Sequence, residues 1–287
     1  MELFKKKSKE PPQPQYYVSA TGIQTYNYHV YYMSKIEKVL YFILAFVVGA
    51  GVAYLFYGGL AKDQFDNPTV TTWILNIVIC GAVGTFAGIM YLPIRTEQIQ
   101  QKKQKNLKLQ FRELLDALTT SLGSGKNIMD SFKSAYDDLG VIYDPDASIM
   151  RELAIILDGV VNNFNIEDLL LDFGNRSGID DITSFANVFE TCYRKGGNIR
   201  EVIRNTQQII TEKMEVEMEI ETIVTGAKNE QMIMTVMPIA IVGIIKFMSP
   251  EFAKNFATPA GIIATSVGIV SFIAAYFIGK SVLSIKI

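Results

Sequence analysis

Two stretches of sequence near the N-terminus decide the fold. Residues 39–61 read VLYFILAFVVGAGVAYLFYGGLA and residues 73–94 read WILNIVICGAVGTFAGIMYLPI, with no charged side chain in either. Residues 231–245 and 259–279 repeat this pattern near the C-terminus. About 20 apolar residues in a helix cross a hydrocarbon core of about 30 Å. We therefore expect four transmembrane helices, over 39–61, 73–94, 231–248 and 259–279.

The composition of the whole chain conceals this segregation. The 287 residues include 27 Lys+Arg and 29 Asp+Glu, a formal net charge of −2, and 49% are hydrophobic. These averages describe neither the apolar stretches nor the charged segments between them, which argues against a freely soluble single-domain enzyme. Cys80 lies in an apolar stretch and Cys192 in a polar one. They are not expected to meet, which argues against a disulfide scaffold.

The distribution of basic residues predicts the orientation in the membrane. Segment 1–38 carries six Lys+Arg, 62–72 one, 95–230 sixteen, 249–258 one and 280–287 two. Basic residues favour the cytoplasmic side. We expect cytoplasmic tails at both ends, two outer loops at 62–72 and 249–258, and a cytoplasmic domain over 95–230, all in a multi-pass protein of the cell inner (plasma) membrane.

The predicted N-terminal tail, 1–38, is basic and rich in tyrosine. It begins with Lys5, Lys6 and Lys7, and six tyrosines follow between positions 16 and 32. Lysine favours anionic headgroups and tyrosine the membrane interface. We expect a flexible cytoplasmic tail with an interfacial patch.

One short pattern recurs three times in segment 95–230: Asn127-Ile-Met-Asp130, Asn165-Ile-Glu-Asp168 and Asn198-Ile-Arg-Glu201. Asparagine is a strong N-cap, and an acid in the first turn complements the helix dipole. Glycines that can end the preceding helix stand before two of the copies. Each copy therefore predicts the tip of a helical hairpin. The residues assigned to the tips are Gly125, Asn127, Asn165, Gly196, Gly197 and Asn198.

Three hairpins imply six helices. Their expected ranges are 96–123, 127–139, 147–162, 165–177, 180–194 and 198–230, the first continuing from the second span and the last entering the third. The fold class is therefore all-α, a polytopic membrane protein with four transmembrane helices and a six-helix antiparallel cytoplasmic bundle built from helical hairpins.

The last of these helices carries an acidic cluster beside an apolar stripe. The stripe is expected along Val202, Thr206, Ile209, Val216, Ile220, Ile223 and Ala227. The glutamates are Glu212, Glu215, Glu217, Glu219 and Glu221. Two interpretations remain open, a solvated rim of the helix or a surface for a basic protein partner.

Sequence patterns of enzyme sites are absent or incomplete. Gly123-Ser-Gly-Lys126 has Thr120 where a phosphate-binding loop needs its first glycine, and Asn127 where it needs Ser or Thr. His29 lies in the predicted tail without Cys or acidic neighbours. Acidic pairs such as Asp137–Asp138 could hold a cation or cap helices. Segment 95–230 carries a net charge of −7, which argues against nucleic-acid binding. We expect no catalytic, cofactor-binding or metal-binding residues and no enzyme activity.

The spans favour helix packing over transport. Gly84 and Gly88 lie at a helix-contact spacing, with packing inside one chain and packing between chains both open. Lys246 is the one charged residue in the spans, near an end from which it can reach the interface. A transporter or channel, or a membrane-anchored enzyme, is the alternative class of function.

Three segments resemble a known family. Phe111 to Ile128, FRELLDALTTSLGSGKNI, resembles the first helical hairpin of the type II secretion F-protein family. Asn165 to Gly178 resembles its middle segment in the Tad branch, and Lys195 to Ile203, followed by Met237-Pro238, resembles its last hairpin and membrane entry. The resemblance covers about 95–285, and the paired spans on either side of one domain look like the TadB-like members.

The resemblance implies an inner-membrane platform protein of a Tad-type or type IV pilus-like machine or type II secretion system. Such a platform couples a cytoplasmic hexameric secretion ATPase to pilin extraction and assembly. Its implied partners are that ATPase, a second (TadC-like) platform subunit or another copy of itself, pilin subunits and membrane lipid. Classical members can carry a cation at an acidic site near the position of Glu190, but the spacing of Glu190 to Gly196 departs from their pattern and no metal is carried over.

Overall fold

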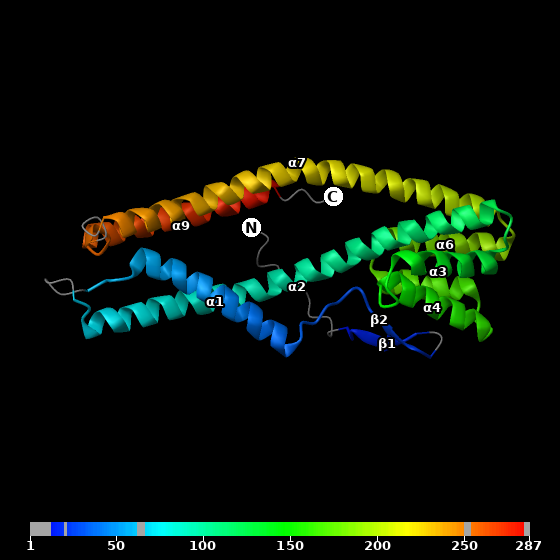
Figure 1. The fold of residues 1–287 in the computed structure, drawn as a ribbon, viewed down its shortest axis with the longest axis horizontal. Helices are drawn as coiled ribbons and strands as arrows, with labels where there is room; N and C mark the ends of the chain where they lie inside the picture. The colour runs from blue at the N-terminus through cyan, green and yellow to red at the C-terminus, as the bar shows by residue number, and fades with distance from the viewer. Residues whose placement is uncertain (1–12, 20–21, 62–66, 250–253, 284–287) are drawn as a thin grey trace. The chain divides into compact units, whose positions relative to one another are not determined.

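The computed structural model describes residues 13–19, 22–61, 67–249 and 254–283. The chain divides into two compact units (Figure 1). Unit 1 comprises Met1–Tyr32 with Thr96–Glu215, and unit 2 comprises Met33–Arg95 with Val216–Ile287. The described residues are mostly α-helical, with one small sheet in unit 1.

Four helices of unit 2 are long and apolar enough to cross a membrane. They are α1 (Lys35–Tyr57), the first part of α2 (Val70–Gly123), the last part of α7 (Ile199–Met248) and α9 (Pro259–Leu283). No more than 11% of each apolar window is buried within the protein. Helices with apolar side chains exposed on most sides are stable in the hydrocarbon core of a bilayer and not in water. The four helices therefore indicate a membrane protein.

The first span begins and ends earlier than predicted. Ser34 and Glu37 form a reciprocal capping box, so α1 begins at Lys35, and it ends at Tyr57 with Gly58 as C-cap. The prediction of 39–61 missed the cap and included Gly58 to Ala61, which lie beyond the helix.

Both long helices pass through the predicted boundaries between span and domain. α2 is one helix of 54 residues that contains Pro93, and α7 is one helix of 50 residues that contains Pro238. Proline is tolerated in membrane helices because neighbouring groups satisfy the freed backbone carbonyls. No loop separates span from domain in either helix.

Glycine and lysine contacts hold the helices of unit 2 together. A Cβ at Gly88 would lie 2.5 Å from the ring of Phe42, and one at Gly84 would lie 2.8 Å from the ring of Phe46. The glycine pair therefore packs α2 against α1 within the chain. Lys246 donates to the carbonyl of Leu55 at 2.7 Å, in the last turn of α1, where carbonyls lack helical partners and attract a cation.

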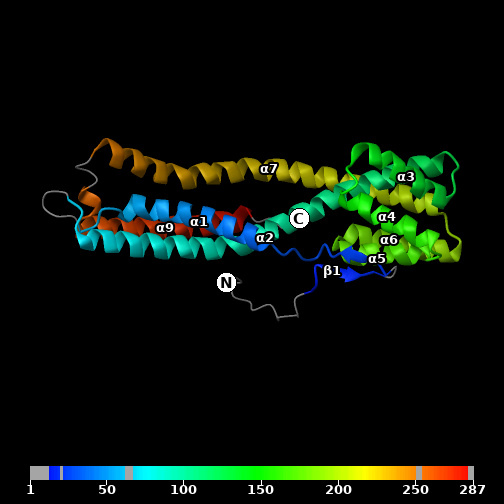
Figure 2. The same cartoon turned by 60° about the horizontal axis from the view of Figure 1, so that its bottom comes forward.

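The helices of unit 1 share one apolar core. They are the end of α2, α3 (Ile128–Ile142), α4 (Ser148–Val161), α5 (Ile166–Ser177), α6 (Asp180–Lys195) and the start of α7. Figure 2 shows α3 to α6 gathered beside these parts of α2 and α7. Phe111, Phe173 and Phe185 meet edge to face at its centre. The buried positions recur every three or four residues, as a core-facing helix stripe requires.

The three asparagine turns begin α3, α5 and α7. The Asn127 side chain accepts from the Asp130 N–H at 2.8 Å, and that of Asn198 from the Glu201 N–H at 3.3 Å. Asn165 lacks this bond and instead donates from Nδ2 to Asp168 at 3.0 Å. Gly125 and Gly196 have positive φ values of 90° and 76°, the backbone conformation that glycine adopts at least cost.

The apolar stripe of α7 differs from the prediction. The residues of α7 buried in the unit 1 core are Ile199, Ile203, Ile210 and Met214. Ile209 and Val216, which belong to the predicted apolar stripe, are 56% and 55% exposed. The helix carries two apolar stripes at helical spacing, and the sequence pattern alone does not say which one faces the core.

The N-terminal segment also differs from the expected flexible tail. Strands β1 (Tyr16–Val18) and β2 (Gln24–Tyr26) pair antiparallel, with Tyr16 opposite Tyr26. Tyr28 follows them into the core of unit 1, where it is 5% exposed. The expectation of a flexible tail is wrong for residues 13–19 and 22–32, while Lys5 to Lys7 lie outside the described residues.

Candidate functional site: a buried arginine that holds the N-terminal segment

The most unusual polar group of unit 1 is the guanidinium of Arg176, near the C-terminal end of α5. The Arg176 side chain is 1% exposed. It lies one turn after Phe173 on the core-facing side of the helix. A buried charge must be paired and fully hydrogen-bonded, because transfer out of water is costly.

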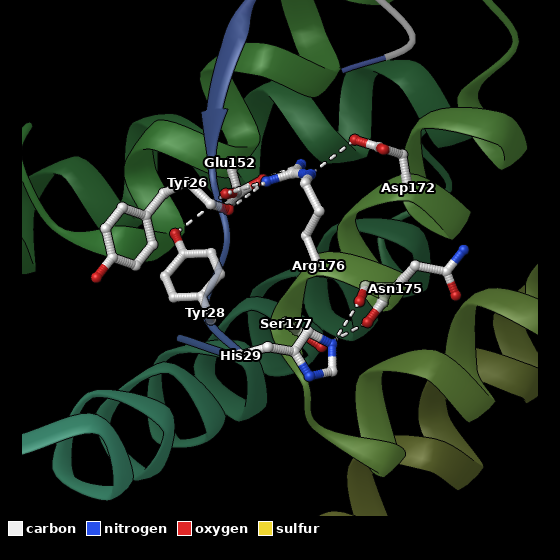
Figure 3. Close-up of polar contacts among 9 residues, drawn as sticks. Tyr26, Tyr28, His29, Glu152, Asp172, Asn175, Arg176 and Ser177 are labelled. Atoms are coloured by element: carbon white, nitrogen blue, oxygen red, sulfur yellow. Dashed lines mark hydrogen bonds and ion pairs between the residues drawn. The ribbon is translucent and has the colours of Figure 1, made fainter. Parts of the chain in front are cut away.

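Two carboxylates satisfy Arg176 (Figure 3). Glu152 on α4 accepts two bonds, at 2.7 Å from Nη1 and 2.5 Å from Nη2, and is itself 2% exposed. Asp172 accepts from Nε at 2.7 Å. The planar fork of arginine matches a carboxylate in this bidentate way, so the pair fixes α4 against α5 in one geometry.

The N-terminal segment completes this network. The Tyr28 hydroxyl donates to Glu152 Oε1 at 3.0 Å, and the Tyr28 N–H donates to the Arg176 carbonyl at 2.9 Å. Arg176 Nη1 in turn donates to the Tyr26 carbonyl at 3.3 Å. Residues from the first 30 positions thus bind the buried ion pair with both side chain and backbone.

Further contacts surround the same segment. Gln104 on α2 donates to the Tyr28 carbonyl at 3.2 Å, and His29 Nε2 lies 2.8 Å from the Asn175 carbonyl. Lys103 Nζ lies 4.3 Å from the centre of the Tyr31 ring, within the range of a cation–π interaction.

The electrostatics of the site keep Tyr28 neutral. Burial raises the pKa of the Tyr28 hydroxyl, and the Glu152 carboxylate raises it further. Burial also raises the pKa of Glu152, against the opposing effect of Arg176. Burial lowers the pKa of Arg176, but the two carboxylates outweigh it and raise that pKa above its ordinary value. Tyr28 therefore acts as a hydrogen-bond donor to Glu152 of the buried arginine–carboxylate pair.

This arrangement is suited to holding two parts of the chain together. The polar atoms of Arg176 and Glu152 bond to one another, to Asp172 and to the N-terminal segment, and both side chains are shielded from solvent. Over the described ranges, no group of three or more His, Cys, Asp or Glu side chains is placed to hold a metal ion.

The glutamates predicted on α7 lie apart from this site and on two faces of the helix. Glu212, Glu215 and Glu219 are exposed and follow a spacing of three and four residues, so they share one face. Glu217 is half-buried, and both Glu217 and Glu221 have interaction partners. The five residues therefore do not form one surface.

The structure joins two of the predicted tips. Arg194, near the end of α6, donates to Asp168 at 2.8 Å and to Glu167 at 3.4 Å at the start of α5. Gly197 packs against Cys192, where a Cβ would lie 3.1 Å from the sulfur.

Sequence reasoning missed Arg176, Glu152 and Tyr28, although a signal was present. Glu152 lies between Ile149 and Leu153, on the apolar stripe of its helix, and Arg176 continues the stripe of α5. A charged residue at a core position predicts a buried partner. It does not identify that partner.

Comparisons with protein-family models, with curated proteins and with solved structures find no match to this chain.

Proposed function

We propose that this protein is an inner-membrane platform component of a Tad-type or type IV pilus-like machine or type II secretion system, which couples a cytoplasmic secretion ATPase to pilin extraction and assembly. The sequence resemblance suggests this role. The structural observation that best supports it is the continuity of α2 and α7, each of which carries a candidate membrane span and core residues of unit 1. A displacement of unit 1 would reach the membrane through two unbroken helices.

The proposed topology places unit 1 in the cytoplasm as a six-helix bundle, with both termini on the same side. The basic-residue counts of the connecting segments support this orientation. In intact cells, a thiol reagent that does not cross the membrane should label single cysteines at Asn67 and Asn255 and leave Cys192 unmodified. Labelling of Cys192 from outside would overturn the topology.

The partner surface that we propose is the outer face of α7. Glu212, Glu215 and Glu219 lie beside Ile209 and Val216 on this face, and these two apolar side chains are more than half exposed. The two apolar positions are seven residues apart, the spacing with which one helix packs against another. A basic amphipathic helix of the ATPase or of a second platform subunit would complement both the charge and the apolar positions.

Copurification from detergent tests the function and the surface together. The intact protein should copurify with the hexameric secretion ATPase of its own cell, and the triple variant Glu212→Lys, Glu215→Lys and Glu219→Lys should lose that ATPase. The loss should depend on salt, because exposed charges are screened beyond about 10 Å at 0.1 M salt.

A matched control reverses three other exposed acids of unit 1, Asp137, Asp138 and Asp144. This control should retain the ATPase. Absence of any ATPase from the parent preparation would contradict the function, whereas retention by the glutamate variant would contradict only the surface.

A further inference from the structure

We propose that residues 13–19 and 22–32 form a releasable strap that occupies a peptide-binding groove of unit 1. The strap is the hairpin with the chain that follows it to Tyr32. The groove is lined by the side chains of Gln100, Lys103 and Gln104 on α2, Glu152 on α4 and Arg176 on α5, and by the backbone carbonyl of Asn175 on α5. The occupant of the groove is the chain's own N-terminal segment, and the state of the strap is independent of the proposed function.

The groove recognises the strap through its main chain. The N–H of Tyr28 and the carbonyls of Tyr26, Tyr28 and His29 all bond to groups of α2 and α5. Main-chain bonds give affinity for an extended segment, and a side-chain pocket adds specificity. The strap is therefore bound in the manner of a peptide ligand.

Tyr28 supplies the specific contact. Among the buried hydrophobic residues of the unit 1 core that the structure describes, Tyr28 alone comes from the strap, and Tyr26 packs against that core partly buried. The polar side chains Ser19, Thr25 and Asn27 of the strap are also buried. The helices would thus keep nearly all of their apolar contacts if the strap left.

The strap has little stability of its own. Its two strands have three residues each, and an isolated two-stranded hairpin is marginally stable at best in water. Tyr16 and Val18 on the first strand are 51% and 67% exposed. The order of the strap depends on the groove.

Hydrogen exchange on the full-length protein in detergent micelles tests the proposal. Tyr28→Phe removes the one hydroxyl that binds Glu152, and Tyr16→Phe is the matched control, because Tyr16 is half exposed and its ring contact with Tyr26 does not need the hydroxyl. Loss of a hydrogen bond to a charged group should raise the exchange rates of the strap amides, over residues 16–19 and 22–29, about 10- to 100-fold in Tyr28→Phe. Exchange in α3 to α6 should not change, and the control should match the parent.

Two results would overturn the strap. If the strap amides exchange at the parent rate in Tyr28→Phe, the tyrosine does not hold the segment in the groove. If the exchange rates of the strap amides rise together with those of α3 to α6, the segment opens only when the whole of unit 1 unfolds and is a permanent part of its fold.

Discussion

Replacement of Arg176 by methionine is the most informative perturbation of unit 1. The change keeps much of the side-chain volume and removes the charge. Glu152 would remain 2% exposed and would keep the hydrogen bond from the Tyr28 hydroxyl, at 3.0 Å. Removal of one member of a buried pair typically costs about 3–5 kcal/mol, because it leaves an uncompensated charge.

The double variant Arg176→Met with Glu152→Leu should behave differently. Apolar replacement of a whole buried pair is often neutral, or stabilising by about 1–4 kcal/mol. Here the Tyr28 hydroxyl loses its acceptor, at a cost of about 1–3 kcal/mol. Asp172 and the Tyr26 carbonyl also lose their bonds from Arg176, so the double variant should lie below the parent but above Arg176→Met, which alone leaves Glu152 buried and unpaired.

Native-state hydrogen exchange at the amides of α4 and α5, in detergent, measures these differences. The control is Arg151→Met on α4, whose partner Asp146 is 91% exposed at its side chain, so the ion pair is worth about 0–1 kcal/mol. The reasoning fails if Arg176→Met costs no more than Arg151→Met, or if the double variant loses the sum of the two single losses. Either result would mean that water reaches Glu152 in the folded protein.

Three further predictions concern other parts of the chain. Gly196 has φ 76°, and a Cβ added there would meet nothing within 4 Å. Gly196→Val should therefore lower the free energy of unfolding of unit 1 by about 1–3 kcal/mol through backbone strain alone, and Gly196→Asn by less, because asparagine tolerates a positive φ better. Equal melting temperatures of the two variants would contradict this backbone explanation. Burial raises the pKa of the Asp181 carboxyl, but the hydrogen bond from Lys213 at 2.6 Å and the neighbouring lysine charges outweigh it and lower that pKa. The stabilisation from Asp181 is therefore present above the ordinary aspartate pKa of about 3.9 and lost as the pH falls through the lower folded value, so urea titrations of parent and Asp181→Asn should differ at pH 6 and converge in acid. Gly88→Ala should destabilise the α1–α2 pair by about 1–3 kcal/mol through overpacking, while Gly81→Ala, which has nothing within 4 Å of its Cβ, should not, as thermal unfolding in detergent would show.

The sequence by itself determined the elements whose causes are local. Apolar length sets a membrane helix, and an asparagine followed by an acid sets a helix start, each within a few residues along the chain. The four apolar helices and the starts of α3, α5 and α7 follow from such signals. The start of α1 was misplaced because the capping box at Ser34 lies outside the apolar run, and its end was misplaced because the apolar run continues past the C-cap Gly58.

The tertiary structure alone decided which surfaces meet. α7 carries two apolar stripes of similar spacing, and only contact with the other helices selects Ile203 and Ile210 over Ile209 and Val216. The same holds for the buried pair, because Arg176 meets Glu152 from 24 positions away and Tyr28 from 148. Periodicity places a side chain on a face of its own helix, but the partner of that face depends on how distant segments pack, and a charge at a core position indicates only that a partner exists.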